Sequence, residues 1–147
     1  GNIGTPTRLN YTAIGDPVNL ASRLEGLAKY YGAGVLVSAA AAQSARGAFK
    51  LREVDRVIVL GREKPESIWE LLTTIDDPRY DEMIVSYGEV LQTYRSADFS
   101  RARGLVEQHR VAFPHDRAAA TLQRIIEAAG QQPRPATWDA VTRMEQK

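Results

Sequence analysis

Asn19 and Arg23 are the residues whose types and spacing point most directly to chemistry. They lie four positions apart in YTAIGDPVNLASRLEGLAKYYG, residues 11–32, so a helix would place both side chains on one face. Asn19 falls near the positive end of that helix, and Arg23 adds a permanent charge with a planar fork of donors. Such a pair suits a phosphate-bearing ligand. Spacing alone favours a structural role instead, in which Asn19 bonds local backbone and Arg23 pairs with Asp16 or with the neighbours of Glu25.

The helix that must carry this pair has clear boundaries in the sequence. Asp16 is a favourable N-cap, Pro17 suits the first helical position and Gly32 is typical of a C-terminus, which predicts a helix over 17–31. Around it we expect a strand piece at Ile3, further strands over 9–14, 34–37, 49–60 and 68–72, and a helix over 39–46. This order predicts an α+β fold with helices on one face of a mostly antiparallel sheet.

The two parts of the chain differ in texture, and Asp76-Asp77-Pro78 marks the boundary between them. We therefore predict two units, over 1–75 and 76–147. The second unit is expected to be helical, with a tight turn near 96–98 and no convincing strand. His109 and His115 have no cysteine or third ligand nearby, so we expect solvated or capping roles for them and assign no metal ligand.

Composition excludes several classes of protein. The chain has 147 residues, a formal net charge of +1 and no cysteine, so it has no disulfide framework and no thiolate site. We expect no nucleic-acid partner, because this charge gives no general attraction to one. No apolar run approaches the roughly 18 residues of a membrane-spanning helix. The first residues, Gly-Asn-Ile-Gly, read like the middle of a strand, so we expect the chain to begin inside a larger protein.

A longer string of residues carries a family resemblance. GNIGTPTRLNYTAIGDPVNLASRLEGLAKYYGAGVLVS, residues 1–38, resembles the class III nucleotidyl cyclases, the adenylate and guanylate cyclase family. REVDRVIVLGREKPESIWEL, residues 52–71, resembles the strand–turn–strand that closes their catalytic domain. The resemblance implies that residues 1–75 are the C-terminal half of a ferredoxin-like cyclase core. It also implies a dimer with active sites at the subunit interface.

The resemblance implies roles for single residues. Asn19 matches the asparagine that orients the ribose, and Arg23 matches the arginine that meets the α-phosphate as the substrate's 3′-hydroxyl attacks it and pyrophosphate leaves. Thr12 falls where the family reads the purine, and its hydroxyl leads us to expect ATP rather than GTP. Arg62 or Lys64 falls near the outer phosphates, although solvated turn charges are an equal alternative.

The family also binds two divalent metal ions, Mg²⁺ or Mn²⁺, through aspartates in the first half of its domain. Asp16, Asp55 and Asp76 read instead as a helix cap, a strand residue and a turn residue. We therefore expect the chain to supply the Asn/Arg half of an adenylate cyclase and to be inactive alone. Its partner would be a second copy or a complementary cyclase half, in a cytoplasmic location with a parent protein that could be anchored in the inner membrane.

The helical unit resembles a tetratricopeptide helix pair in YRSADFSRAR…FPHD, followed by the Trp-Asp tail of many bacterial cyclases. One such unit must dock on something, so we expect a protein partner there. Two other classes stay open. One is a degenerate cyclase domain that binds nucleotide without turnover, and the other is a scaffold in which the helical unit couples dimers or binds proteins.

Overall fold

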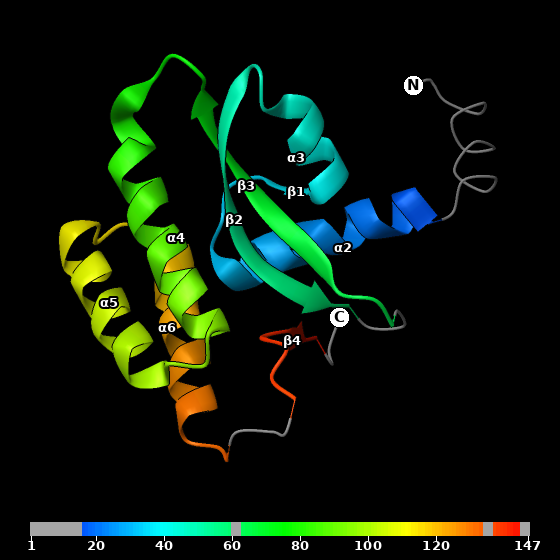
Figure 1. The fold of residues 1–147 in the computed structure, drawn as a ribbon. Helices are drawn as coiled ribbons and strands as arrows, with labels where there is room; N and C mark the ends of the chain where they lie inside the picture. Colours follow the sequence, from blue (N-terminus) through cyan, green and yellow to red (C-terminus); the bar gives the residue numbers. More distant parts are fainter. Residues whose placement is uncertain (1–15, 60–62, 134–136, 145–147) are drawn as a thin grey trace.

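The computed structural model of the chain describes residues 16–59, 63–133 and 137–144. Its elements in order are α2 (Asp16–Tyr31), β1 (Leu36–Ser38), α3 (Ala39–Ala45), β2 (Phe49–Ile58), β3 (Glu66–Thr74), the 3-10 turn η1 (Pro78–Tyr80), α4 (Asp81–Arg95), α5 (Phe99–Ala112), α6 (Arg117–Gly130) and β4 (Thr142–Arg143). This arrangement confirms the predicted α+β fold class (Figure 1). The strand pieces expected at Ile3 and over 9–14 lie outside the described residues.

The sheet has the strand order β1-β3-β2-β4. β3 pairs antiparallel with both β1 and β2, in a register that sets Arg52 opposite Glu70. β4 pairs parallel with the end of β2, where Val57 lies opposite Thr142. The expectation of no strand in residues 76–147 was therefore wrong. A strand of two residues carries no readable alternation, and it forms only because the tail returns to the sheet.

Helix α2 confirms the predicted helix over 17–31 and begins one residue earlier. It ends at Gly32, whose φ of +71° is a conformation that glycine adopts at low cost. Its apolar stripe enters the core at helical spacing through Leu24, Leu27 and Tyr31.

The helices α4, α5 and α6 gather on one side of the sheet (Figure 1). The turn between α4 and α5 falls at the predicted residues 96–98, and Ala97 has a φ of +65° there. α5 packs on both α4 and α6, α4 contacts β2, and α6 contacts α2. In the described part of the chain, no helix is both long enough and apolar enough to span a membrane.

One hydrophobic core spans the two units that the sequence predicts. It joins buried side chains of α2, β2 and β3 to buried side chains of α4, α5 and α6, among them Leu27, Val54, Ile68, Val90, Val106 and Leu122. The division at residues 75 and 76 stays a prediction. Residues before and after this boundary are stabilised by the same buried apolar surface.

Candidate functional site

Helix α2 contains both residues that the sequence singled out. Asn19 and Arg23 lie within one continuous helix, so their Cα atoms are about one turn apart, although the side chain of Asn19 lies outside the described part. Arg23 is partly exposed, immediately before buried Leu24. Among the residues that the structure describes, Arg23 takes part in no hydrogen bond or ion pair.

The other predicted site residues are not brought together with Arg23. Thr12 and Arg62 lie outside the described residues, and Lys64 is exposed just before β3. The structure therefore describes two of the five predicted side chains, Arg23 and Lys64. These two do not contact each other.

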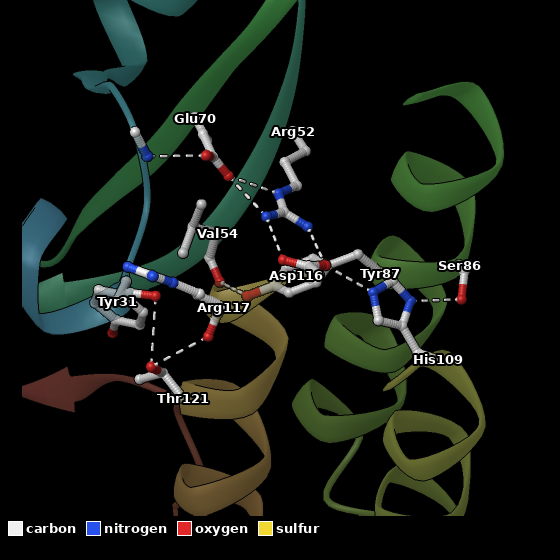
Figure 2. Close-up of polar contacts among 11 residues, drawn as sticks. Tyr31, Arg52, Val54, Glu70, Ser86, Tyr87, His109, Asp116, Arg117 and Thr121 are labelled. Carbon is white, nitrogen blue, oxygen red and sulfur yellow. Dashed lines mark hydrogen bonds and ion pairs between the residues drawn. The ribbon is translucent and has the colours of Figure 1, made fainter. Parts of the chain in front are cut away.

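A buried polar network that the sequence analysis did not predict lies between the sheet and the helices (Figure 2). Arg52 of β2 donates to Glu70 of β3 through Nε at 3.0 Å and Nη2 at 2.7 Å, and to Asp116 through Nη1 and Nη2, both at 2.7 Å. His109 of α5 contacts Asp116 through Nε2 and Ser86 of α4 through Nδ1, both at 2.7 Å. We call these five residues the Arg52 network.

The Arg52 network satisfies the conditions under which buried charge is tolerated. Burial opposes the charge on Arg52, but hydrogen bonds and charge from Asp116, with Glu70, raise the pKa of the guanidinium. Burial also acts to raise the pKa of Asp116, yet Arg52 and His109 hold it well below its usual value. The Arg52 guanidinium additionally lies 4.5 Å from the ring centre of Tyr87. Such a paired cluster specifies one packing of sheet and helices.

His109 differs from the expectation that both histidines are solvated or capping. Its side chain is 1% exposed, because it faces the inside of the helix bundle, where its ring packs against Tyr87 and Phe113 at centroid distances of 5.9 and 5.0 Å. Both ring nitrogens have polar partners there. His115 is exposed, as predicted. Within the described residues, no group of three or more His, Cys, Asp or Glu side chains could hold a metal ion.

A pocket of about 410 Å³ opens beside the network. Its lining combines the buried side chains of Arg52, Glu70 and Asp116 with the exposed basic side chains of Arg79, His115 and Arg117. Ser86, His109 and Asp116 form a serine–histidine–aspartate series, which in hydrolases activates a nucleophile. Here Asp116 is held by Arg52, and neither Ser86 nor His109 lines the pocket. We therefore assign the series a structural role.

A second polar cluster lies at the end of α2. Tyr31 donates its hydroxyl to Oδ2 of Asp55 at 2.5 Å, and Thr142 of β4 donates to the same oxygen at 2.7 Å. Thr121 of α6 lies with its hydroxyl 3.3 and 3.4 Å from the carbonyl oxygens of Tyr30 and Tyr31. Figure 2 shows the contact with Tyr31 and a longer one, at 3.5 Å, with the carbonyl of Arg117 one turn earlier in α6. We call Tyr31, Asp55, Thr121 and Thr142 the α2 clamp.

The bond between Tyr31 and Asp55 in the α2 clamp forms in a dry environment. Asp55 and Tyr31 are both fully buried, and a register shift between Glu53 and Asp55 allows consecutive strand residues to be buried together. Burial raises the pKa of Asp55, while the hydrogen bonds from Tyr31, Thr142 and the Arg56 amide act to lower it. Burial and the nearby Asp55 charge raise the pKa of Tyr31 far above its ordinary value, so Tyr31 remains a donor at neutral pH.

Part of the chain is similar to known adenylate cyclases. It is 40% identical over 75 residues, 51% of its length, to adenylate cyclase 1 of Rhizobium meliloti, and 39% identical over 74 residues, 48% of its length, to the adenylate cyclase of Anabaena cylindrica. It is 35% identical over 99 residues, 65% of its length, to the terminal-differentiation-specific adenylate cyclase of Dictyostelium discoideum. These stretches cover only 11%, 15% and 4% of those proteins. No protein-family model and no solved structure matches the chain.

Proposed function

We propose that this chain supplies part of the active site of a class III adenylate cyclase, which converts ATP into 3′,5′-cyclic AMP and pyrophosphate. The observation that carries the proposal is the similarity to three adenylate cyclases at 35–40% identity. The partly exposed Arg23, without a partner among the described residues, supports it. The active site would form with a second copy of this chain or with a complementary cyclase half.

In this proposal α2 contributes alignment and charge stabilisation. Asn19 orients the ribose so that its 3′-hydroxyl attacks the α-phosphorus in line with the leaving pyrophosphate. The 3′-oxygen forms the new bond to phosphorus, the bond to the pyrophosphate oxygen breaks, and the hydroxyl proton is released. Arg23 donates to the α-phosphate oxygens as negative charge increases on them. Thr12 would bind the adenine, and Arg62 or Lys64 the outer phosphates.

Two divalent ions, Mg²⁺ or Mn²⁺, would activate the hydroxyl and shield the phosphates when bound. The described residues do not fit such a site, because no cluster of ligands is present and the buried carboxylates of Asp55, Glu70 and Asp116 are occupied by protein donors. The metal ligands would come from the complementary half of the cyclase, so we expect residues 1–147 alone to be inactive.

The test is Arg23→Ala in the full-length protein, with Lys29→Ala as the matched control. Lys29 is an exposed basic residue in the last turn of the same helix, so both variants lose one positive charge from α2. We expect cyclic AMP formation from Mn²⁺-ATP to fall about 10²–10³-fold in Arg23→Ala, the cost of losing one donor to developing charge, and to be retained in Lys29→Ala.

Dimerisation should be the same in both variants when it is measured by light scattering. Unchanged turnover in Arg23→Ala would show that the proposed arginine role is wrong. A wild-type protein that binds ATP without producing cyclic AMP would instead identify a degenerate, nucleotide-binding cyclase domain.

A further inference from the structure

The last turn of α2 is held by residues that lie about a hundred positions further along the chain. We propose that α6 and the tail strand β4 position α2, and that Thr121 and Thr142 are therefore positioning residues for the cyclisation attributed to Arg23. This inference rests on the proposed function. In this arrangement α6 and β4 act mechanically on α2, the helix that carries Arg23.

The first connection runs through one oxygen atom. Oδ2 of Asp55 accepts the hydroxyl of Tyr31 from α2 and the hydroxyl of Thr142 from β4. Because Asp55 and Tyr31 are fully buried, water cannot replace the bond between them without opening the core, whereas the bond from Thr142 is partly buried. A displacement of β4 therefore changes the hydrogen bond that holds the end of α2.

The second connection runs through α6. The Thr121 hydroxyl lies within reach of two terminal carbonyl groups of α2, which have no partner within their own helix. The start of α6 also abuts the end of α2, since a Cβ atom added at Gly32 would lie 2.6 Å from Cβ of Arg117. There is no free space into which the end of α2 could shift toward α6.

The start of α6 is itself anchored to the sheet. Asp116, the residue before α6, receives two hydrogen bonds from Arg52 of β2 and one contact from His109 of α5. The Arg52 network thus fixes α6, and α6 together with β4 fixes α2. Figure 2 shows both ends of this connection: Arg52 bonds Asp116 at the start of α6, and Thr121 of the same helix lies against Tyr31 of α2.

A small movement of the end of α2 at the α2 clamp would displace Arg23. Arg23 lies eight positions before Tyr31, which is about 12 Å along the helix at a rise of about 1.5 Å per residue. A tilt of about 5° at the clamp would shift Arg23 by about 1 Å, and a misplacement of this size can cost about 10²-fold in rate. Loss of one clamp bond should permit part of that tilt, so we expect about a 10-fold loss in kcat.

The experiment compares Thr142→Val, Thr121→Val and Tyr31→Phe in the full-length protein. Each change removes one clamp hydroxyl and nearly preserves side-chain shape. Because the clamp positions a group that acts in the transition state, kcat per folded molecule should fall about 10-fold while KM for ATP changes less than about 2-fold. Thr142→Ser and Thr121→Ser keep the hydroxyl and should restore kcat. Thr93→Val, which lies in α4 outside the clamp, is the matched control.

Hydrogen exchange gives a readout that does not depend on activity. Amides at the end of α2, residues 28–33, should exchange faster in Thr142→Val and Tyr31→Phe than in Thr93→Val. Wild-type kcat in the folded Val and Phe variants, with Arg23→Ala inactive, would overturn the positioning role and leave the proposed function standing. Full activity of Arg23→Ala would instead remove the proposed function. Three variants on three elements keep the test decisive if one of them does not fold.

Discussion

Removing Arg52 should destabilise the protein more than removing its partner Asp116. Arg52→Met removes a guanidinium that makes four hydrogen bonds and leaves the carboxylates of Glu70 and Asp116 buried without a counter-charge. Asp116→Leu leaves Arg52 still paired with Glu70. Breaking a buried ion pair by removing one partner costs about 3–5 kcal/mol in the free energy of unfolding. We expect Asp116→Leu near the lower value and Arg52→Met at or above the higher one.

This order can be measured at pH 7 by urea unfolding and by thermal unfolding, with circular dichroism as the signal in both. For a domain of this size, about 1 kcal/mol corresponds to about 3–4 °C in Tm, so Asp116→Leu should lose about 10 °C and Arg52→Met about 15 °C or more. The double variant should be more stable than Arg52→Met alone, because it removes one of the two stranded carboxylates. Arg79→Met is the control, since the Arg79–Asp77 pair is exposed and its loss should change little.

The effect of pH provides a second test with a definite sign. In the wild type the pKa of Asp116 lies well below its usual value, so its stabilisation is present above the unfolded pKa of about 3.9 and is lost as pH falls further. In Arg52→Met the guanidinium no longer opposes the effect of burial, so we expect the pKa of the Asp116 carboxyl to rise and the group to take up a proton on acidification. The difference in the free energy of unfolding between the wild type and Arg52→Met should therefore become smaller below about pH 5. Equal losses in Arg52→Met and Asp116→Leu, or a difference independent of pH, would refute this reasoning.

Three further changes test local packing. Gly32→Ala places an alanine at a φ of +71° and its Cβ against Arg117, so we expect a loss of about 2 kcal/mol in urea unfolding. Gly26→Ala, where Cβ meets nothing in the described structure within 4 Å, should be neutral or stabilising. Trp138→Ala removes ring contacts with Tyr94 and Phe99, so limited trypsin digestion should cut the tail faster, and an unchanged rate would contradict this anchoring.

One member of the Arg52 network has a signal in the sequence, although we expected His109 to be solvated or capping. His109 follows Ala102 by seven residues and Val106 by three, so it continues the buried stripe of α5. A histidine on an apolar stripe predicts burial with polar partners, which is what the structure contains. The partners themselves were not readable, because Arg52 and Asp116 lie 64 positions apart and no local pattern connects them.

The sequence by itself determined the local elements. Helix α2, its end at Gly32 and the turn at 96–98 each depend on signals within a few residues, namely caps, glycine and helical spacing. The same locality places Asn19 and Arg23 on one helix. Only the tertiary structure decided how α2 is held, because Tyr31, Asp55 and Thr142 meet across 24 and 87 positions of chain. Such contacts depend on the packing of whole elements: the return of the tail to β2 creates both β4 and the hydrogen bond from Thr142 to Asp55.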